Sequence, residues 1–215
     1  MKRRIVLCAL GLLMAGSSAH AAGMDEAVAD LQKQWAIIKY ETPDKERQQK
    51  SIAALTDQAS EVSQDNPGKA EPLIWQAIIV STKAGIDGGM GALAGAKQAR
   101  ALLLEAEKIN PEALDGSIYT SLGSLYYKVP GWPLAFGDNA QAKQYLLKAL
   151  AINPDGIDAN FFYGEFLYET GDYAKSKSTL EHGMKAPGRP GRELADKGRR
   201  EEIQELLTKL SSKLS

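Results

Sequence analysis

Apolar residues recur every three or four positions along most of the chain, which is the spacing that places them on one face of an α-helix. Helices are expected over residues 25–41, 44–64, 73–84, 92–109 and 192–212. Their apolar faces include Val28, Leu31, Trp35 and Ile38 in the first segment, and Ile52, Leu55, Ala59 and Val62 in the second. No segment shows the strict alternation of apolar and polar residues that marks a half-buried β-strand. The pattern therefore predicts an all-α fold.

A constant offset relates two of the helical segments. Gly137-Asp138 recurs as Gly171-Asp172, and the same offset relates three further pairs: Ala142 with Ser176, Leu146 with Leu180, and Ala149 with Gly183. The offset matches the period of about 34 residues that is typical of tetratricopeptide (TPR) repeats. A glycine followed at these distances by a small, a large apolar and a small residue is the second-helix half of such a repeat. Pro154 stands where the closing proline of the repeat is expected.

The first-helix half of the repeat contains Gly123 and Gly164, whose separation exceeds the repeat period by seven positions. The seven extra residues fall within VPGWPLAFG, residues 129–137, between the two helices of the earlier repeat. One step upstream, Ala99, Leu103, Ala106 and Asn110-Pro111 continue the same register if the loop around Asp115-Gly116 holds two more residues. Three second helices therefore share one register.

Glycine inside a helix costs roughly 0.5–1 kcal/mol relative to alanine, so Gly123 and Gly164 need a compensating role. The expected role is close helix–helix approach, and Ala142 and Ala149 should serve the same packing. An Asn-Pro pair ends each second helix, because proline cannot continue it. Either Asp155 or Asp158 is expected to cap the helix that follows.

The predicted architecture is a TPR-type α-solenoid of about four helix pairs plus a C-terminal capping helix. The expected parts are a cleaved signal peptide over residues 1–21, a degenerate helix pair over 22–67, repeats over 68–190 (68–111, 112–154 and 155–190), and a capping helix over 191–215. The polar face of the last helix, with Lys197, Arg199, Arg200, Glu201 and Glu202, is expected to be solvated.

The N-terminus has the layout of a secretory signal peptide. A basic start is followed by the apolar run 5–14 and by the small-x-small site Ala19-His20-Ala21. The formal net charge of the chain is −1, and cleavage after Ala21 removes three positive charges and leaves −4. It also removes the only cysteine, Cys8. We expect a periplasmic protein of a Gram-negative cell, with no nucleic-acid partner and no membrane span in the mature chain.

Three segments together resemble one group of proteins: LGSLYYKVPGWPLAFGD, LAINPDGIDANFFYGEFL and APGRPGRELADKGRREEI. They are similar to exported bacterial TPR proteins, and the architecture resembles the T component of TRAP-type transporters. The resemblance covers roughly residues 70 to 210. It implies a periplasmic helical scaffold that works beside a substrate-binding protein for small organic acids or hydrophobic ligands.

Residue types needed for common enzymatic sites are scarce. His182 is the only histidine after residue 21, and no cysteine remains, so a Ser-His or Cys-His nucleophile and a histidine-rich metal cluster lack support. GIDGGMG, residues 85–91, lacks the lysine and hydroxyl residue of a phosphate-binding loop. We therefore expect no enzyme, no cofactor and no metal.

Two turns within helix pairs, 85–91 and 129–137, are expected to be enlarged and to lie side by side on one edge of the solenoid as a collar. In the second turn, Trp132 and Phe136 are candidates for contact with a partner or ligand. The alternative is that these aromatic residues, with Leu134, fold back and cover the end of the helix pair.

The concave groove, which first helices line in this architecture, is the second candidate site. Tyr119, Tyr126, Tyr127, Asn160 and Tyr163 fall on or beside groove positions. The alternative for each of them is inter-helix core. Four arginines cluster near the last helix, namely Arg189, Arg192, Arg199 and Arg200. They are expected either to meet an acidic partner or to pair locally with Glu193, Asp196 and Glu201.

These features predict a non-catalytic scaffold that binds a protein or peptide partner in the periplasm. The alternative function is a small-molecule-binding accessory component of a TRAP-type transporter, with a small organic ligand in the groove or the collar.

Overall fold

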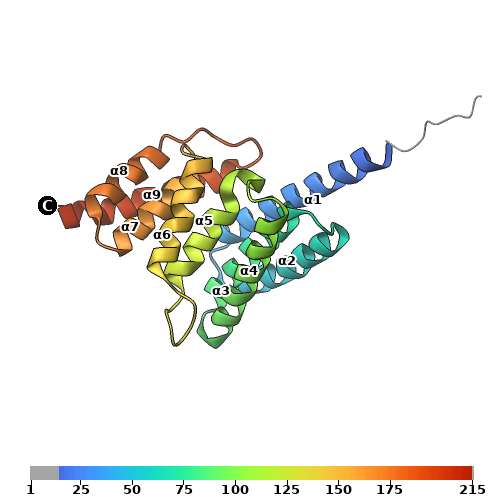
Figure 1. The fold of residues 1–215 in the computed structure, drawn as a ribbon, viewed down its shortest axis with the longest axis horizontal. Coiled ribbons are helices and arrows are strands. Elements are labelled where there is room, and N and C mark those ends of the chain that lie inside the picture. The colour runs from blue at the N-terminus through green and yellow to red at the C-terminus, as the bar shows by residue number, and fades with distance from the viewer. Residues whose placement is uncertain (1–14, 215) are drawn as a thin grey trace, which may run out of the picture.

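The computed structural model describes residues 15–214, and within that range the chain forms nine α-helices and no strand (Figure 1). The helices are α1 (Ala15–Tyr40), α2 (Lys45–Asp65), α3 (Ala70–Asp87), α4 (Gly89–Ile109), α5 (Ala113–Lys128), α6 (Asn139–Ile152), α7 (Ile157–Glu169), α8 (Tyr173–Gly183) and α9 (Glu193–Leu214). Most of the predicted signal peptide, positions 1–14, lies outside the described residues. None of the described helices is long and apolar enough to cross a lipid bilayer.

Consecutive helices pack in pairs, α1 with α2, α3 with α4, α5 with α6, and α7 with α8, and each pair stacks on the next. This stacking confirms the predicted TPR-type α-solenoid of four helix pairs with a further C-terminal helix. The apolar faces read from the sequence form its core, since Leu31, Ile52, Leu103 and Leu146 are at most 1% exposed.

The glycines of the first helices lie where two helices of a pair touch. A Cβ atom on Gly123 would come within 2.6 Å of Leu146 Cγ, and one on Gly164 would come within 2.6 Å of Leu180 Cγ. The partner positions Ala142 and Ala149 are fully buried. Only a residue without a side chain permits this approach, which is the close helix–helix contact expected of these glycines.

The ends of the second helices are as predicted, whereas the expected cap of α7 is wrong. Asn66, Asn110 and Asn153, each followed by proline, are the C-cap residues of α2, α4 and α6. The N-cap of α7 is Gly156, which has no capping side chain. The carboxylate of Asp158 instead pairs with two arginines, and that of Asp155 lies 2.8 Å from His182 Nε2.

The loop expected around Asp115-Gly116 interrupts the start of α5. Leu114, Asp115 and Gly116 have positive φ angles of 51°, 52° and 81°, so the regular part of the helix begins near Ser117. The two extra residues that the repeat register requires in this loop are expected to lie in this irregular segment.

The second enlarged turn expected from the sequence, residues 85–91, does not exist. Helix α3 continues through Asp87 and α4 begins at Gly89, so Gly88 alone separates them. Gly88 and Gly89 have φ angles of 66° and 63°, which glycine adopts freely and which reverse the chain within very few residues. Residues 85–87 belong to the end of α3, and residues 89–91 belong to the start of α4. The predicted collar of two large turns is therefore wrong.

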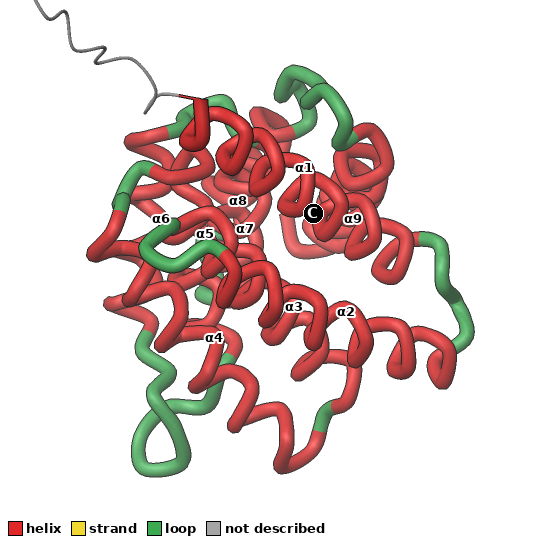
Figure 2. Tube along the Cα trace, turned by 90° about the vertical axis from the view of Figure 1, so that its right-hand side faces the viewer, coloured by secondary structure: helices red, strands yellow, loops and turns green. Residues whose placement is uncertain are grey.

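Helix α9 contacts the first helix as well as the last pair, as the end view suggests (Figure 2). Glu202 accepts hydrogen bonds from Lys39 Nζ (2.9 Å) and from the Tyr40 hydroxyl (3.3 Å). The Tyr40 ring packs so closely on Gly198 that a Cβ there would overlap it. Arg199 is only 4% exposed, so the expectation of a solvated polar face is wrong for this residue. The last helix joins the two ends of the solenoid.

Candidate functional site

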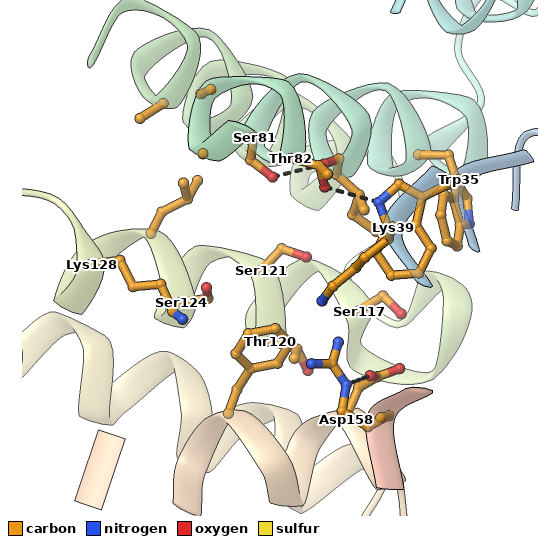
Figure 3. A pocket seen from close by; sticks show the side chains of 18 of the residues that line it. Trp35, Lys39, Ser81, Thr82, Ser117, Thr120, Ser121, Ser124, Lys128 and Asp158 are labelled. Carbon is orange, nitrogen blue, oxygen red and sulfur yellow. Dashed lines mark hydrogen bonds and ion pairs between the residues drawn. The ribbon is translucent and has the colours of Figure 1, made fainter. Parts of the chain in front are cut away.

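The first helices of all four pairs line one cavity of about 350 Å³ (Figure 3). Its wall includes Trp35 and Lys39 of α1, Trp75, Ile78, Ser81 and Thr82 of α3, Ser117, Thr120, Ser121, Ser124 and Lys128 of α5, Asp158 and Phe162 of α7, and Arg189, Arg192 and Arg199 beside or in α9. The cavity therefore lies on the concave side, where the sequence places the groove, and α9 forms part of its wall.

Four hydroxyl side chains of α5 face this cavity, at positions 117, 120, 121 and 124 (Figure 3). Their spacing puts them on one face of the helix. The opposite face carries Ile118 and Leu122, which are fully buried in the core. The helical spacing of Ser and Thr in SIYTSLGS, residues 117–124, is the signal from which this polar stripe could have been predicted.

The character of the wall changes along α5. Near its start, Ser117 and Thr120 lie with Asp158, Arg189 and Arg192 on a stretch of wall that also borders a second cavity of about 310 Å³. Near its end, Leu125 and Val129 border the same cavity as Ala84 and Ala96. One end of the cavity is charged and the other is mainly apolar.

Asp158 is the centre of the charged end. Its carboxylate accepts a hydrogen bond from Arg199 Nε at 2.8 Å and another from Arg189 Nη1 at 2.7 Å. Arg189 also donates to the buried carboxylate of Asp196 at 2.8 Å. Burial by itself would raise the pKa of Asp158, but the guanidinium groups of Arg199 and Arg189 hold that pKa well below its usual value.

Lys39 reaches the same region from α1. Burial, and then the positive charge of Arg199, lower the pKa of the Lys39 ammonium group to about 8, although Glu202 opposes the change. The guanidinium of Arg199 also lies over two aromatic rings, 4.3 Å from the centre of Phe161 and 4.7 Å from that of Phe162. These contacts hold three segments of the chain, α1, α7 and α9, around the charged end.

Arg192 differs from the other cations of the cavity wall. Its guanidinium carbon lies 4.9 Å from the centre of the Trp75 ring. Its Nε atom is buried without a hydrogen-bond partner, as is Nε1 of Trp75. Burial, and then the charge of Arg189, lower the pKa of Arg192 below its usual value. Arg192 is thus a partly buried cation without a carboxylate among the described residues.

Three of the residues predicted for contact with a partner or ligand lie in the cavity wall, namely Arg189, Arg192 and Arg199. Arg189 pairs with Asp196, as the local-pairing alternative expects, but its second carboxylate, Asp158, comes from 31 residues upstream. Arg192 forms no ion pair with any of the described residues.

Four of the residues expected beside the groove line neither cavity, namely Tyr119, Tyr126, Asn160 and Tyr163. Tyr119, Tyr126, Asn160 and Tyr163 are 7%, 6%, 4% and 2% exposed. The rings of Tyr119 and Tyr126 stack on Tyr145 of α6, and the Asn160 amide donates to the carbonyl oxygen of Pro154 at 2.8 Å. The alternative of inter-helix core describes them, because they face the second helices and the turns between pairs.

The long turn between α5 and α6 is present, and its aromatic residues have different environments. Trp132 is 89% exposed and Leu134 is 73% exposed, so neither folds back over the helix pair. Phe136 does fold back, since its ring meets Tyr126 edge-on at 5.5 Å and lies 4.9 Å from the guanidinium of Arg100. Contact of Trp132 with a partner stays a prediction.

Comparison with known proteins supports the repeat assignment. Residues 134–189, which include α6, α7 and α8, match the tetratricopeptide repeat family. A solved structure of a thermophilic TPR protein from Thermus thermophilus has a TM-score of 0.56 at 16% sequence identity, over 88% of this chain and 95% of that one.

A second solved structure, of PilF from Pseudomonas aeruginosa, has a TM-score of 0.35 at 19% identity, over 87% of this chain and 93% of that one. No curated protein matches the sequence. At these identities the similarity to the Thermus protein concerns the fold alone. The chain is therefore an all-α TPR-type solenoid with a concave cavity, and its α6–α8 region matches the TPR family in sequence.

Proposed function

We propose that this chain is an exported, non-catalytic TPR-type scaffold that holds a segment of a protein or peptide partner in its concave cavity. The observation that carries the proposal is the cavity of about 350 Å³, to which all four first helices contribute side chains. Protein interaction is what the TPR fold generally mediates. The signal-peptide pattern of residues 1–21 supports action in the periplasm.

A cavity-filling variant tests this function. Ser121→Trp places a large ring in the cavity, and Leu147→Trp places the same ring on α6 at a side chain that is 44% exposed and outside both cavities. Each tagged protein is used to capture partners from periplasmic extract. The wild type and Leu147→Trp should retain the same partner in near-stoichiometric amount, and Ser121→Trp should lose it. A partner retained equally by Ser121→Trp, or no reproducible partner at all, would contradict the proposal.

A second candidate is a small-molecule-binding accessory role beside a TRAP-type transporter. The observation that favours a small ligand is the cavity itself, whose volume lies in the range of small-molecule sites and whose wall is partly charged and partly apolar. Native mass spectrometry of the purified protein tests this role. A ligand that is carried through purification and absent from Ser121→Trp supports it, and an empty wild-type protein in every preparation contradicts it.

A further inference from the structure

The wall shared by the two cavities has more hydrogen-bond donors than acceptors. Six residues border both cavities, namely Trp75, Ser117, Thr120, Asp158, Arg189 and Arg192. The only carboxylate among them, that of Asp158, already accepts hydrogen bonds from Arg189 and Arg199. The hydroxyl groups of Ser117 and Thr120 donate to backbone carbonyl oxygens. Two buried donor atoms on this wall, Arg192 Nε and Trp75 Nε1, have no acceptor.

The charges around the cavity do not balance among the described residues. Five cations line it, and four of them have carboxylate partners: Arg189 with Asp158 and Asp196, Arg199 with Asp158 and Glu202, Lys39 with Glu202, and Lys128 with Glu165. Arg192 is the fifth, and no ion pair between described residues includes it. A partly buried cation is costly unless it is paired, so the cavity lacks one negative charge.

The orientation of Arg192 leaves part of its guanidinium for a ligand. The Trp75 ring covers one side of the group at 4.9 Å, and the side chain as a whole is only partly buried. A guanidinium stacked on an aromatic ring keeps its terminal N–H groups free in the plane of the group. Two parallel N–H groups in such a plane match the two oxygens of a carboxylate.

The opposite end of the cavity suits an apolar group. From Ser117 to Val129 the wall follows α5 for about 18 Å, at about 1.5 Å per residue. At the far end it is formed mainly by Ala84, Ala96, Leu125 and Val129, whose side chains offer no hydrogen bonds. Lys128 also lines this end, and its ammonium group pairs with Glu165 at 2.7 Å.

We propose that the concave cavity binds an elongated anion: a carboxylate held by Arg192, joined to an apolar body that lies along α5 toward Val129. The proposal rests on the proposed function, because it uses the same cavity. Two sources share this chemistry, namely the C-terminus of a peptide that ends in apolar residues and a free organic acid with an apolar chain.

Calorimetric titration of the purified mature chain with two probe pairs tests the chemistry and separates the sources. Octanoate is compared with octanamide, and the acetylated peptide Ser-Gly-Leu-Val-Leu with a free C-terminus is compared with its C-terminal amide. At least one of the two carboxylates should bind, and its amide should bind about tenfold or more weakly, as expected for loss of a charge-assisted hydrogen bond. Binding of the peptide acid alone points to a peptide C-terminus, and binding of octanoate alone points to a free acid.

Variants of Arg192 assign the effect to this residue. Arg192→Gln should weaken carboxylate binding about tenfold or more and leave binding of the amides unchanged, whereas Arg192→Lys should restore part of the affinity. Lys197→Gln removes one positive charge from the same region at a side chain that is 74% exposed, and it should bind like the wild type. Circular dichroism melts verify that the variants are folded.

The inference is overturned if none of the four probes binds to the wild type, if acid and amide bind equally, or if Arg192→Gln binds the acid as the wild type does. Its failure is distinct from failure of the proposed function. If Ser121→Trp loses the captured partner while Arg192→Gln retains it, the cavity is the binding site and only the carboxylate chemistry is wrong. If Ser121→Trp retains the partner, the proposed function itself fails.

Discussion

Single glycine residues determine how closely the helices of a pair approach. Gly164→Ala would place a methyl group 2.6 Å from Leu180 Cγ in a fully packed contact, and we expect it to destabilise the protein by about 1–3 kcal/mol. Gly85 is the matched control, because it also lies in a helix but a Cβ there meets no atom within 4 Å. Gly85→Ala should stabilise by about 0.5–1 kcal/mol. Urea unfolding measures both, and a Gly164→Ala variant as stable as the wild type would contradict the packing role.

The carboxylate of Asp158 should make stability depend on pH. Its pKa in the folded protein lies below the value near 3.9 of an unfolded chain, so its contribution is complete above about pH 5 and is lost as the pH falls toward the folded pKa. Asp158→Asn should cost about 1–3 kcal/mol at pH 7, between the values for exposed and buried ion pairs, because the side chain is 31% exposed. The variant should also lose less stability than the wild type between pH 5 and pH 3.

Thermal melts across this pH range compare Asp158→Asn with Asp155→Asn. The Asp155 side chain is 71% exposed, and its replacement should change stability by less than about 0.5 kcal/mol. Equal pH profiles for the wild type and Asp158→Asn would show that the carboxylate does not stabilise the charged end of the cavity.

Residue roles that depend on the repeat register could be read from the sequence, and those that depend on tertiary contacts could not. The packing of Gly123, Gly164, Ala142 and Ala149 follows from spacing alone. One partner of Arg199, Glu202, lies three residues further along the same helix. The other, Asp158, could not be read this way, because it lies 41 residues upstream and meets Arg199 only when α9 packs on α7. For the same reason the tyrosines gave no sign of whether they face the groove or the second helix.

Among the connections, the turn of residues 129–137 combines one packed and one exposed aromatic residue. Phe136→Ala should destabilise the protein by about 1–2 kcal/mol, because its half-buried ring contacts Tyr126 and Arg100. Trp132→Ser should change stability by less than about 0.5 kcal/mol, since the ring is 89% exposed. Chemical denaturation measures the free energy of unfolding of both variants and so tests the two predictions. A loss of stability in Trp132→Ser that matches the loss in Phe136→Ala would contradict the observed exposure.

Helix α9 is the element that brings the two ends of the solenoid together. Gly198→Leu should displace the Tyr40 ring and weaken the contact between α9 and α1, at a cost of about 1–3 kcal/mol. Lys197→Leu adds the same side chain at the adjacent, 74% exposed position and serves as the control. Hydrogen exchange should become faster in α9 and in the end of α1 for Gly198→Leu only. Unchanged exchange in that variant would mean that α9 holds its place without this contact.

At the scale of elements, periodicity predicted the helix pairs and the seven-residue expansion, because both change the distance between repeat positions. It did not predict the short connection at Gly88. Several glycines in GIDGGMG suggested a long flexible turn, but two residues with positive φ are enough to reverse the chain there. The contact of α9 with α1 also left no trace in the repeat pattern, since it joins the two ends of the chain.

In the molecule as a whole, the last helix contacts both ends of the solenoid and forms part of the wall of the concave cavity. The position of this cavity on the concave side could be predicted from the architecture. Its lining could not, because Trp75, Arg192 and the hydroxyl face of α5 come together only through the stacking of all four pairs. The proposed function places the partner in this cavity and not on the outer surface of the solenoid.

Photo-crosslinking in living cells tests this placement. The photoreactive residue p-benzoylphenylalanine replaces Lys128, which lines the cavity with a side chain that is 46% exposed and so leaves the interior open, or Leu147 on α6, which lies outside the cavity. We expect a discrete crosslinked adduct from position 128 and none from position 147. Equal adducts from both positions, or an adduct from position 147 alone, would contradict it.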